Sequence, residues 1–265
     1  MKQRRSPERG PATVDFGAEP VTPGEKTARV AGVFHAVADR YDAMNDIMSV
    51  GLHRALKRIA VDSLALRAGQ CVLDLAGGTG DMARLISPIA GRTGRVVLCD
   101  INASMIAIGQ DRMLDAGSAN VVPAQADAEL LPFPSATFDR VVIAFGLRNL
   151  TDKERALREM HRVLRPGGRA LVLEFSTPRS AWLRSAYRAF QGLWPMAGRL
   201  VVGDAAPYRY LVESIEMHPN QAALSLMMRD AGFEDVRVDD LLGGIAAMHT
   251  GAKPDHPVQQ GGTAS

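Results

Sequence analysis

The residues best suited to hold a cofactor lie in a glycine-rich turn at positions 74–81, between a short apolar run and a helix-like segment. Ala76, Gly78 and Gly80 fall two residues apart, unlike the G-x-G-x-x-G spacing of dinucleotide-binding turns. Asp74 precedes them, and its carboxylate could accept a hydrogen bond from an amino acid's ammonium group but would repel a pyrophosphate. We therefore expect Asp74, Gly78 and Gly80 to bind S-adenosylmethionine. A nicotinamide-dependent oxidoreductase is the alternative from another enzyme class.

Two later acidic positions could hold the rest of such a cofactor. Asp100 ends the next apolar run, where a carboxylate can accept both hydroxyls of a ribose. It could instead cap the following helix, as Asn102 and Ser104 also could. Asp127 and Ala128 follow the third strand, where an acidic side chain is well placed to hold an adenine amino group. An ordinary polar turn is the other interpretation of Asp127.

These positions lie at the ends of alternating elements. Apolar runs at 71–75, 95–99, 121–122, 140–145 and 170–175 predict strands, and two late strands are expected at 233–238 and 244–249. Between them, apolar residues recur at helical spacing from 81, over 103–116, from about 152, and over 221–230. This alternation predicts an α/β, Rossmann-like fold with a mostly parallel, seven-stranded sheet and helices on both faces.

Composition limits the remaining possibilities. We expect one domain over residues 25–253, with a mobile tail at 1–24 and another tail at 254–265. A net charge of +2 gives no basis for a nucleic-acid partner, and no apolar run approaches the roughly 18 residues of a membrane span. Cys71 and Cys99 should be too far apart along neighbouring strands for a disulfide, and two free thiols fit a cytoplasmic location.

From about residue 13 to 253 the chain resembles the ubiquinone/menaquinone-biosynthesis C-methyltransferases. The glycine turn is common to many methyltransferases, whereas two other segments are much more specific to this family. These are the Tyr-Asp-x-Met-Asn-Asp segment at 41–46 and the Phe-Gly-Leu-Arg-Asn segment at 145–149. Further residues that carry the resemblance lie at 33–38, 48–54, 100–105, 173–176 and 208–215.

The resemblance implies a class I S-adenosylmethionine methyltransferase that uses no metal and methylates a ring carbon of a polyprenylated quinol. Its cofactor contacts correspond to Thr79, Asp100, Asp127 and Ala128. Other quinone-biosynthesis enzymes are possible partners of such a protein.

Methylating an aromatic carbon requires a quinol hydroxyl to lose its proton, which pushes charge onto the neighbouring ring carbon. Arg148, just past the fourth strand, could stabilise the resulting phenolate, and it is the candidate catalytic residue. An ion pair with Asp152 or Glu174 that fixes the loop is an equally weighted interpretation. His53 could act as a base and Tyr41 could orient the quinol oxygen, although both could be ordinary helix residues.

A helical insertion is expected at about 176–218, and it is rich in aromatic residues and arginines. Trp182 and Trp194 both lie there, among Arg179, Arg184, Arg188 and Arg199. Such a segment suits a lid that rests on a membrane surface, so loose contact with the inner face of the membrane is expected. A cap packed on the sheet is the competing interpretation.

Two alternatives within the same fold stay open. One is an O- or N-methyltransferase that acts on a soluble small molecule. The other is a non-catalytic, lipid-binding member of a quinone-biosynthesis assembly, which the retained glycines, Thr79 and Asp100 argue against.

Overall fold

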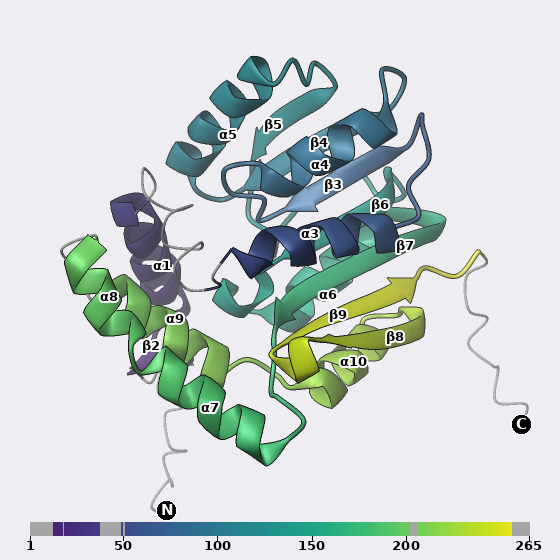
Figure 1. Ribbon diagram of the computed structural model, residues 1–265. Helices are drawn as coiled ribbons and strands as arrows, with labels where there is room; N and C mark the ends of the chain where they lie inside the picture. The colour runs from purple at the N-terminus through teal and green to yellow at the C-terminus, as the bar shows by residue number, and fades with distance from the viewer. Residues whose placement is uncertain (1–12, 18, 38–48, 50, 202–205, 256–265) are drawn as a thin grey trace, which may run out of the picture.

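A computed structural model describes residues 13–17, 19–37, 49, 51–201 and 206–255. Its centre is a seven-stranded sheet in the order β5-β4-β3-β6-β7-β9-β8, in which only β9 runs antiparallel to its neighbours (Figure 1). The predicted class I methyltransferase fold is thereby confirmed. The strands are β3 (Cys71–Leu75), β4 (Arg95–Asp100), β5 (Val121–Gln125), β6 (Phe138–Ala144), β7 (Leu164–Phe175), β8 (Glu234–Leu241) and β9 (Ala246–Ala252).

The central strands are apolar on both sides because helices cover both faces of the sheet. Leu73, Val97 and Val141 point into a core shared with α6 (Lys153–Val163) and α10 (Gln221–Asp230). The alternate residues, such as Val72 and Val142, point into a second core. That core is shared with α3 (Leu52–Ser63), α4 (Asp81–Ala90) and α5 (Ala103–Asp115). In Figure 1, α3 and α4 lie in front of the sheet and α6 and α10 behind it.

The N-terminal region is more ordered than the expected tail at 1–24. Strands β1 (Val14–Phe16) and β2 (Glu19–Val21) pair as a hairpin, and α1 (Pro23–Val37) begins directly after it. The Phe16 ring stacks on Tyr210 with centroids 4.6 Å apart, and Val21 is buried. The described part of the expected tail is therefore paired and packed on the rest of the domain. Two three-residue strands are too short for a periodic signal, and their anchor on Tyr210 is remote in sequence.

The expected helical insertion is present. It consists of α7 (Ala181–Gln191), α8 (Trp194–Val201) and α9 (Ala206–Glu216), which we call the cap. The cap lies beside α1, beyond the carboxyl ends of the parallel strands (Figure 1). Trp194, Tyr208, Leu211 and Ile215 form a separate small core inside it. Two short 3₁₀ turns, η2 (Leu147–Asn149) and η3 (Leu242–Gly244), follow β6 and β8.

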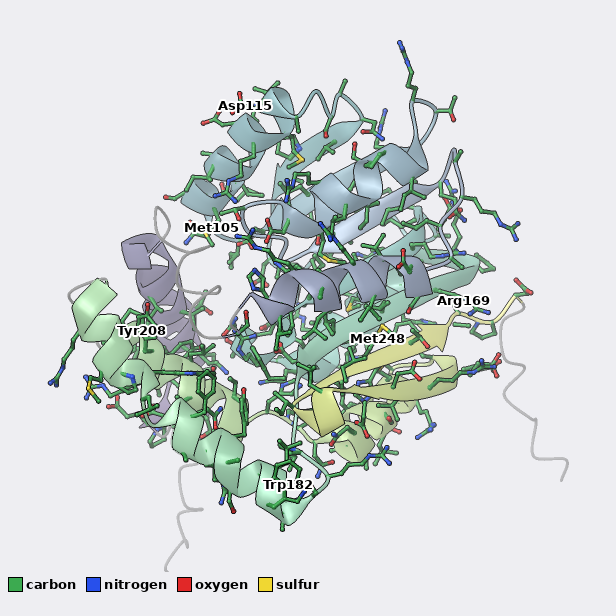
Figure 2. The ribbon with its side chains drawn as sticks, viewed as in Figure 1. Met105, Asp115, Arg169, Trp182, Tyr208 and Met248 are labelled. Atoms are coloured by element: carbon green, nitrogen blue, oxygen red, sulfur yellow. The ribbon has the colours of Figure 1, made fainter. Side chains whose placement is uncertain are left out.

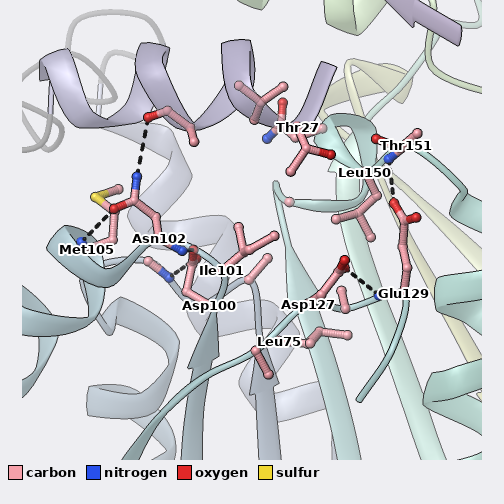
Figure 3. A pocket seen from close by; sticks show the side chains of 18 of the residues that line it. Thr27, Leu75, Asp100, Ile101, Asn102, Met105, Asp127, Glu129, Leu150 and Thr151 are labelled. Carbon is pink, nitrogen blue, oxygen red and sulfur yellow. Dashed lines mark hydrogen bonds between the residues drawn. The ribbon is translucent and has the colours of Figure 1, made fainter. Parts of the chain in front are cut away.

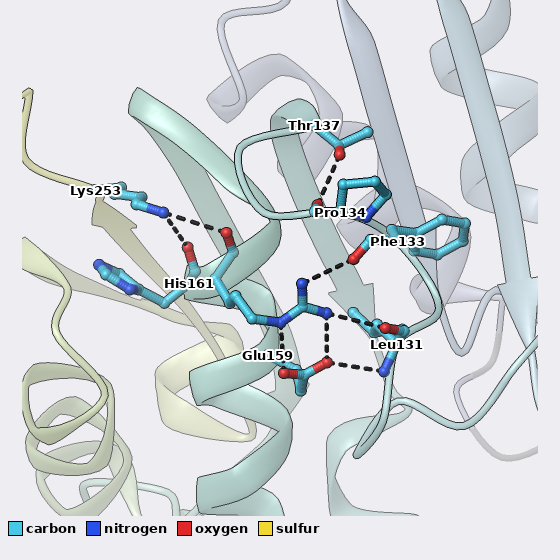
Figure 4. A network of polar contacts seen from close by, with 8 residues as sticks. Leu131, Phe133, Pro134, Thr137, Glu159, His161 and Lys253 are labelled. Atoms are coloured by element: carbon cyan, nitrogen blue, oxygen red, sulfur yellow. Dashed lines mark hydrogen bonds and ion pairs between the residues drawn. The ribbon is translucent and has the colours of Figure 1, made fainter.

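A polar network holds the loop after β5 against α6 (Figure 4). Arg162 donates to the carbonyls of Phe133 and Leu131 at 2.7 and 2.9 Å, and it forms a two-pronged ion pair with Glu159. Lys253 donates to the carbonyls of His161, Arg162 and Leu164, the last of which directly follows α6, where a cation is favoured. The network fixes the backbone just beyond Asp127 and Ala128.

Cys71 and Cys99 are both free thiols, as predicted. They lie on neighbouring strands but four positions apart in register, because Cys71 pairs with Arg95 and Cys99 with Leu75. Among the residues that the structure describes, no helix is both long and apolar enough to span a bilayer.

Candidate active site

A cavity opens at the carboxyl ends of β3, β4 and β6, the edge where open α/β sheets bind ligands (Figure 3). The turns after these strands form its floor, and one side of α1 forms its roof. The lining residues are Thr27, Val30, Ala31, Leu75, Ala76, Gly78, Asp100, Ile101, Asn102, Met105, Ala126, Asp127, Ala128, Glu129, Phe145, Gly146, Asn149, Leu150 and Thr151. Of the predicted site residues, Gly78, Asp100, Asp127 and Ala128 meet here.

The backbone under the cavity is strained at two positions. Ala76 and Phe145 have φ angles of +51° and +57°, a region that non-glycine residues rarely occupy. They follow adjacent strands, and a Cβ added to Gly146 would lie 2.7 Å from the Cβ of Ala76. Gly146 therefore allows the two turns to meet. Such strain is typical of ligand-binding sites, where the surrounding fold maintains it.

Asp100 joins the glycine turn to the next strand. Its Oδ2 accepts a hydrogen bond from the Gly78 amide and its Oδ1 one from the Asn102 amide, both at 2.9 Å. Burial raises the pKa of this carboxyl, and the hydrogen bonds from Asn102, Gly78 and Ile101 lower it. Asn102 is the true cap of α5, since its side chain accepts from Ser104 and Met105. Capping therefore does not require Asp100, whose carboxylate lines the cavity.

The loop after β5 closes the other end of the cavity. Asp127 is exposed, and its Oδ1 accepts from the Glu129 amide at 2.9 Å. Glu129 in turn accepts from the amides of Thr151 and Asp152, just before α6, at 2.7 and 2.9 Å. Ala128 is buried and forms an apolar wall. Asp127 therefore stabilises a polar turn, and the Asp127 residue also lines the cavity.

Three predicted cofactor residues, Asp74, Thr79 and Gly80, are not among the residues that line this cavity. Asp74 is fully buried beneath the turn, where its Oδ2 accepts from the Ala83 amide at 2.9 Å. Burial raises its pKa to about 7. Thr79 accepts from Arg112 at 3.0 Å in a separate groove, which Gly80 also lines. A Cβ on Gly77 would lie 2.7 Å from Asp74 Oδ2, so the turn itself covers Asp74.

Arg148 forms the ion pair that was one of its two interpretations, and its partner is Glu174. Its Nη1 lies 2.8 Å from Glu174 Oε1 and also donates to the Phe145 carbonyl. Both side chains are buried, and the guanidinium lies 5.4 Å from the centre of the Phe175 ring. Arg148 does not line this cavity. It holds the turn that carries Phe145, Gly146 and Asn149.

The other two candidates fall elsewhere. His53 is buried on α3, with its Nδ1 2.8 Å from Ser49 Oγ, and it faces the groove that contains Thr79. Tyr41 lies outside the described residues. Within the described ranges, no group of three or more His, Cys, Asp or Glu side chains is arranged to hold a metal ion.

Sequence reasoning missed the roof of the cavity. Thr27, Val30 and Ala31 come from α1, and their sequence gives no sign of what the helix covers. Asn149 was also missed as a lining residue, and the Tyr210 hydroxyl donates to its Oδ1 at 3.2 Å. The contact spans 61 positions in sequence.

The lining fits an adenosyl cofactor. Asp100 supplies a carboxylate for ribose hydroxyls, Asp127 a second acceptor, and Ile101, Met105 and Leu150 apolar surface for a purine. Gly78 has a φ of +56°, and the nearest atom to a Cβ added there is Met105 Cε at 3.6 Å. A side chain at Gly78 would therefore project beside Met105 and narrow the cavity.

The chain was compared with known proteins. The model of the ubiE/COQ5 methyltransferase family matches residues 23–253. A Pseudomonas fluorescens (strain Pf0-1) protein named ubiquinone/menaquinone biosynthesis C-methyltransferase UbiE is 53% identical over 254 residues, which cover 95% of this chain and 99% of that protein. The protein of the same name from Ectopseudomonas mendocina (strain ymp) is 54% identical over 95% of this chain and 98% of its own length.

Solved structures agree on the fold. An Aquifex aeolicus SAM-dependent methyltransferase has a TM-score of 0.57 at 19% identity, over 74% of this chain and 88% of that one. A putative Haloferax volcanii methyltransferase, solved with the Trm112 activator, has a TM-score of 0.64 at 19% identity, over 86% and 99%. Because the family model spans nearly the whole described domain and the relatives match over almost their full length, this chain belongs to the ubiE/COQ5 methyltransferase family.

Proposed function

We propose that this chain transfers the methyl group of S-adenosylmethionine to a ring carbon of a polyprenylated quinol in menaquinone or ubiquinone biosynthesis. The observation that carries the proposal is the full-length match, above 50% identity, to relatives named as C-methyltransferases of that biosynthesis. The cavity at the strand ends, with its acidic and apolar lining, is consistent with it. The ring is a demethylmenaquinol, a methoxy-polyprenyl benzoquinol, or either.

The cofactor would be held by the residues that meet at the cavity. Asp100 would accept hydrogen bonds from the ribose, Asp127 would accept from the adenine amino group, and Gly78 and Ala128 would allow close approach. Asp74, Thr79 and Gly80 would act indirectly, by keeping the turn at 74–81 in shape. When bound, S-adenosylmethionine supplies an electrophilic methyl group on a positively charged sulfur.

The chain's own part in catalysis is alignment, exclusion of water and stabilisation of the deprotonated quinol. Arg148 would be a positioning residue, since it fixes the Phe145 carbonyl and therefore the turn that carries Gly146 and Asn149. Its buried positive charge, shared with Glu174, would also favour a nearby phenolate at short range. The cap and α1 would keep water from the reacting ring.

The substrate's location follows from its chemistry. A polyprenyl tail dissolves in a lipid bilayer, so the quinol ring is presented at a membrane surface. We therefore place the protein at the cytoplasmic face of the membrane, loosely attached, where it would exchange intermediates with other quinone-biosynthesis enzymes.

The test is a methylation assay with purified protein, S-adenosylmethionine and short-chain prenyl versions of both quinols. We expect one equivalent of S-adenosylhomocysteine per product, with the new methyl on a ring carbon by NMR. Asp100→Ala is the matched control and should lose most of the activity. Methyl found on oxygen, or activity only on polar soluble acceptors, would favour the soluble small-molecule methyltransferase. Cofactor binding with no transfer to any quinol would favour the non-catalytic lipid-binding protein.

A further inference from the structure

Helix α7 leaves most of its surface exposed. Its one fully buried residue is Gln191, which is 3% exposed, whereas Trp182 is 72% exposed. The nearby Trp194 Nε1 is buried and has no hydrogen-bond partner among the described residues. A helix normally turns its apolar side inward and its polar side to water. Tyr187 and Phe190 contact Trp194, but the side of α7 that carries Trp182 is not covered by any of the residues that the structure describes.

The exposed apolar residues form one continuous stripe. Trp182, Ala186 and Ala189 recur at spacings of four and three, which places them on one side of α7, and Leu193 follows in the turn after the helix ends at Gln191. Leu193 is 56% exposed, Phe190, next to the stripe, 36%, and Met196 at the start of α8 61%. Figure 2 shows Trp182 in the first turn of α7, at the lower edge of the molecule in this view. Scattered exposed apolar residues are common, but a stripe that includes a tryptophan indicates a binding surface.

The same segment carries charge of only one sign. Between Glu174 and Asp204 the sequence has four arginines and no Asp or Glu. Arg179 pairs with Asp240 from β8, and Arg184 donates to the Pro178 carbonyl. Arg188 and Arg199 are exposed, and no carboxylate pairs with them in the described part of the chain. The surface therefore combines apolar side chains with uncompensated positive charge.

We propose that this stripe of α7, continued by Leu193 and Met196, is a docking surface for an anionic lipid bilayer. The helix would lie in the plane of the interface with Trp182 and Leu193 among the headgroups and upper acyl chains, while Arg188 and Arg199 attract anionic lipid. The proposal rests on the proposed function in one respect, because a polyprenylated substrate explains why the cap needs a membrane.

A bilayer fits this surface better than a second copy of the chain does. A symmetric contact through the stripe would bring the arginines of two copies together with no acidic residue of the segment to compensate them. A bilayer with anionic headgroups supplies the missing negative charge. Tryptophan, with an apolar ring and one N–H, is also enriched where proteins meet lipid headgroups.

The test is co-sedimentation of the full chain with vesicles of phosphatidylcholine, with and without phosphatidylglycerol. We expect binding to the anionic vesicles that weakens as salt is added. Trp182→Ser with Leu193→Ser should weaken it by at least about tenfold. Arg188→Gln with Arg199→Gln should weaken it by about fivefold for each charge removed.

Matched controls remove the same residue types elsewhere. Leu114→Ser with Leu130→Ser changes two leucines that are 70% and 67% exposed but remote from the cap, and it should leave vesicle binding unchanged. Fluorescence gives a second measurement, because the chain has two tryptophans and Trp194 is buried. Anionic vesicles should shift the parent's emission to the blue, and Trp182→Phe should abolish that shift.

Equal sedimentation of the parent and of the Trp182→Ser, Leu193→Ser protein would overturn the docking surface. A dimer would also overturn it. If light scattering shows that the parent is a dimer, that the variant is a monomer and that neither binds vesicles, then a second copy of the chain occupies the surface. Methylation of a short-chain quinol in detergent-free solution separates the two proposals. If neither the parent nor the Trp182→Ser, Leu193→Ser variant binds vesicles but both methylate the quinol, the docking surface is refuted and the proposed function stands.

Discussion

Helices α6 and α7 are consecutive along the chain and each has 11 residues, yet they differ in what they bury against the protein. In α6, Ala156, Leu157, Met160 and Val163 are completely buried against the sheet, and charged side chains face outward. In α7, tryptophan faces outward and glutamine inward. Apolar periodicity thus identifies an amphipathic helix but does not identify what its apolar side contacts. The neighbouring element decides, and the side of α7 that carries Trp182 has no neighbour among the described residues.

The largest effect is expected at the seam between the sheet and the cap. Arg148→Ala leaves Glu174, which is 1% exposed, as an unpaired buried charge and should destabilise the protein by about 3–5 kcal/mol. Arg148→Met combined with Glu174→Met should recover much of that loss, because neither charge is then left alone. Urea unfolding measures both. Full stability of Arg148→Ala would mean that the pair does not stabilise the turn after β6.

The same pair separates positioning from stability. Arg148→Lys keeps the charge but loses the planar guanidinium that reaches Phe145 and Glu174 together, so it should recover turnover only in part. If Arg148 stabilises the quinolate, turnover should fall by about a hundredfold or more in Arg148→Ala while cofactor affinity changes far less. Turnover and cofactor affinity that fall together with stability would leave a purely structural role.

The next effect contrasts the two helices directly. Met160→Ala removes a fully buried side chain of α6 and should cost about 2–5 kcal/mol of unfolding free energy. Trp182→Ser removes a larger side chain from the exposed side of α7 and should change the free energy of unfolding by no more than about 0.5 kcal/mol. Thermal or urea unfolding of the two variants decides the matter. A comparable loss in Trp182→Ser would show that protein covers α7 after all.

A smaller effect is expected on cofactor affinity. Asp100→Ala should weaken S-adenosylmethionine binding by roughly 2–3 kcal/mol, the scale of hydrogen bonds to a charged group. Asp74→Asn should leave it almost unchanged, because Asp74 lies beneath the turn and an amide oxygen can still accept from Ala83. Isothermal titration of the two variants beside the parent tests this. A large loss in Asp74→Asn would restore the direct ammonium contact expected from the sequence.

The smallest effect concerns the first residue of α6. Burial, together with the charge of Lys26, lowers the pKa of Lys153 from 10.5 to about 8, and both ammonium groups donate to the Leu150 carbonyl. The unfolded chain binds this proton more tightly, so stability should rise as pH increases from about 8 to 10.5. Below pH 8 the cost of the buried charge is fully present. Lys153→Met should therefore stabilise the protein at pH 7 by on the order of 1–2 kcal/mol, and the gain should fade by pH 10. Urea unfolding of the parent and of Lys153→Met at pH 7 and pH 10 tests whether the variant is the more stable protein at the lower pH.

Most of the sheet could be predicted because its strands are buried on both faces. Their apolar runs are continuous, and α10 occupies the predicted residues 221–230. Helix α3 was not identified as an element, and the hairpin β1–β2 was assigned to a tail. In both cases the residues that stabilise the element lie far away, as Tyr210 does from Phe16. Local sequence patterns do not reveal contacts between residues that are distant in sequence.

The candidate site was predictable in part for a similar reason. Positions at strand ends follow from topology, and Gly78, Asp100, Asp127 and Ala128 do line one cavity. The direction of a side chain at those ends does not follow from topology. Asp74 turns under the glycine turn toward the Ala83 amide, and Thr79 turns outward to Arg112. The partner of Arg148 was one of two carboxylates weighed from the sequence, and only the three-dimensional structure selects Glu174.

The most direct test of the central claim is the quinone content of cells from which the gene has been deleted. If the chain methylates the ring of a polyprenylated quinol, the ring-demethylated precursor should accumulate and the mature quinone should disappear. Expression of the parent chain should reverse both changes, and the Asp100→Ala chain should not. An unchanged quinone profile after deletion, in cells with no second copy of the gene, would contradict the assignment.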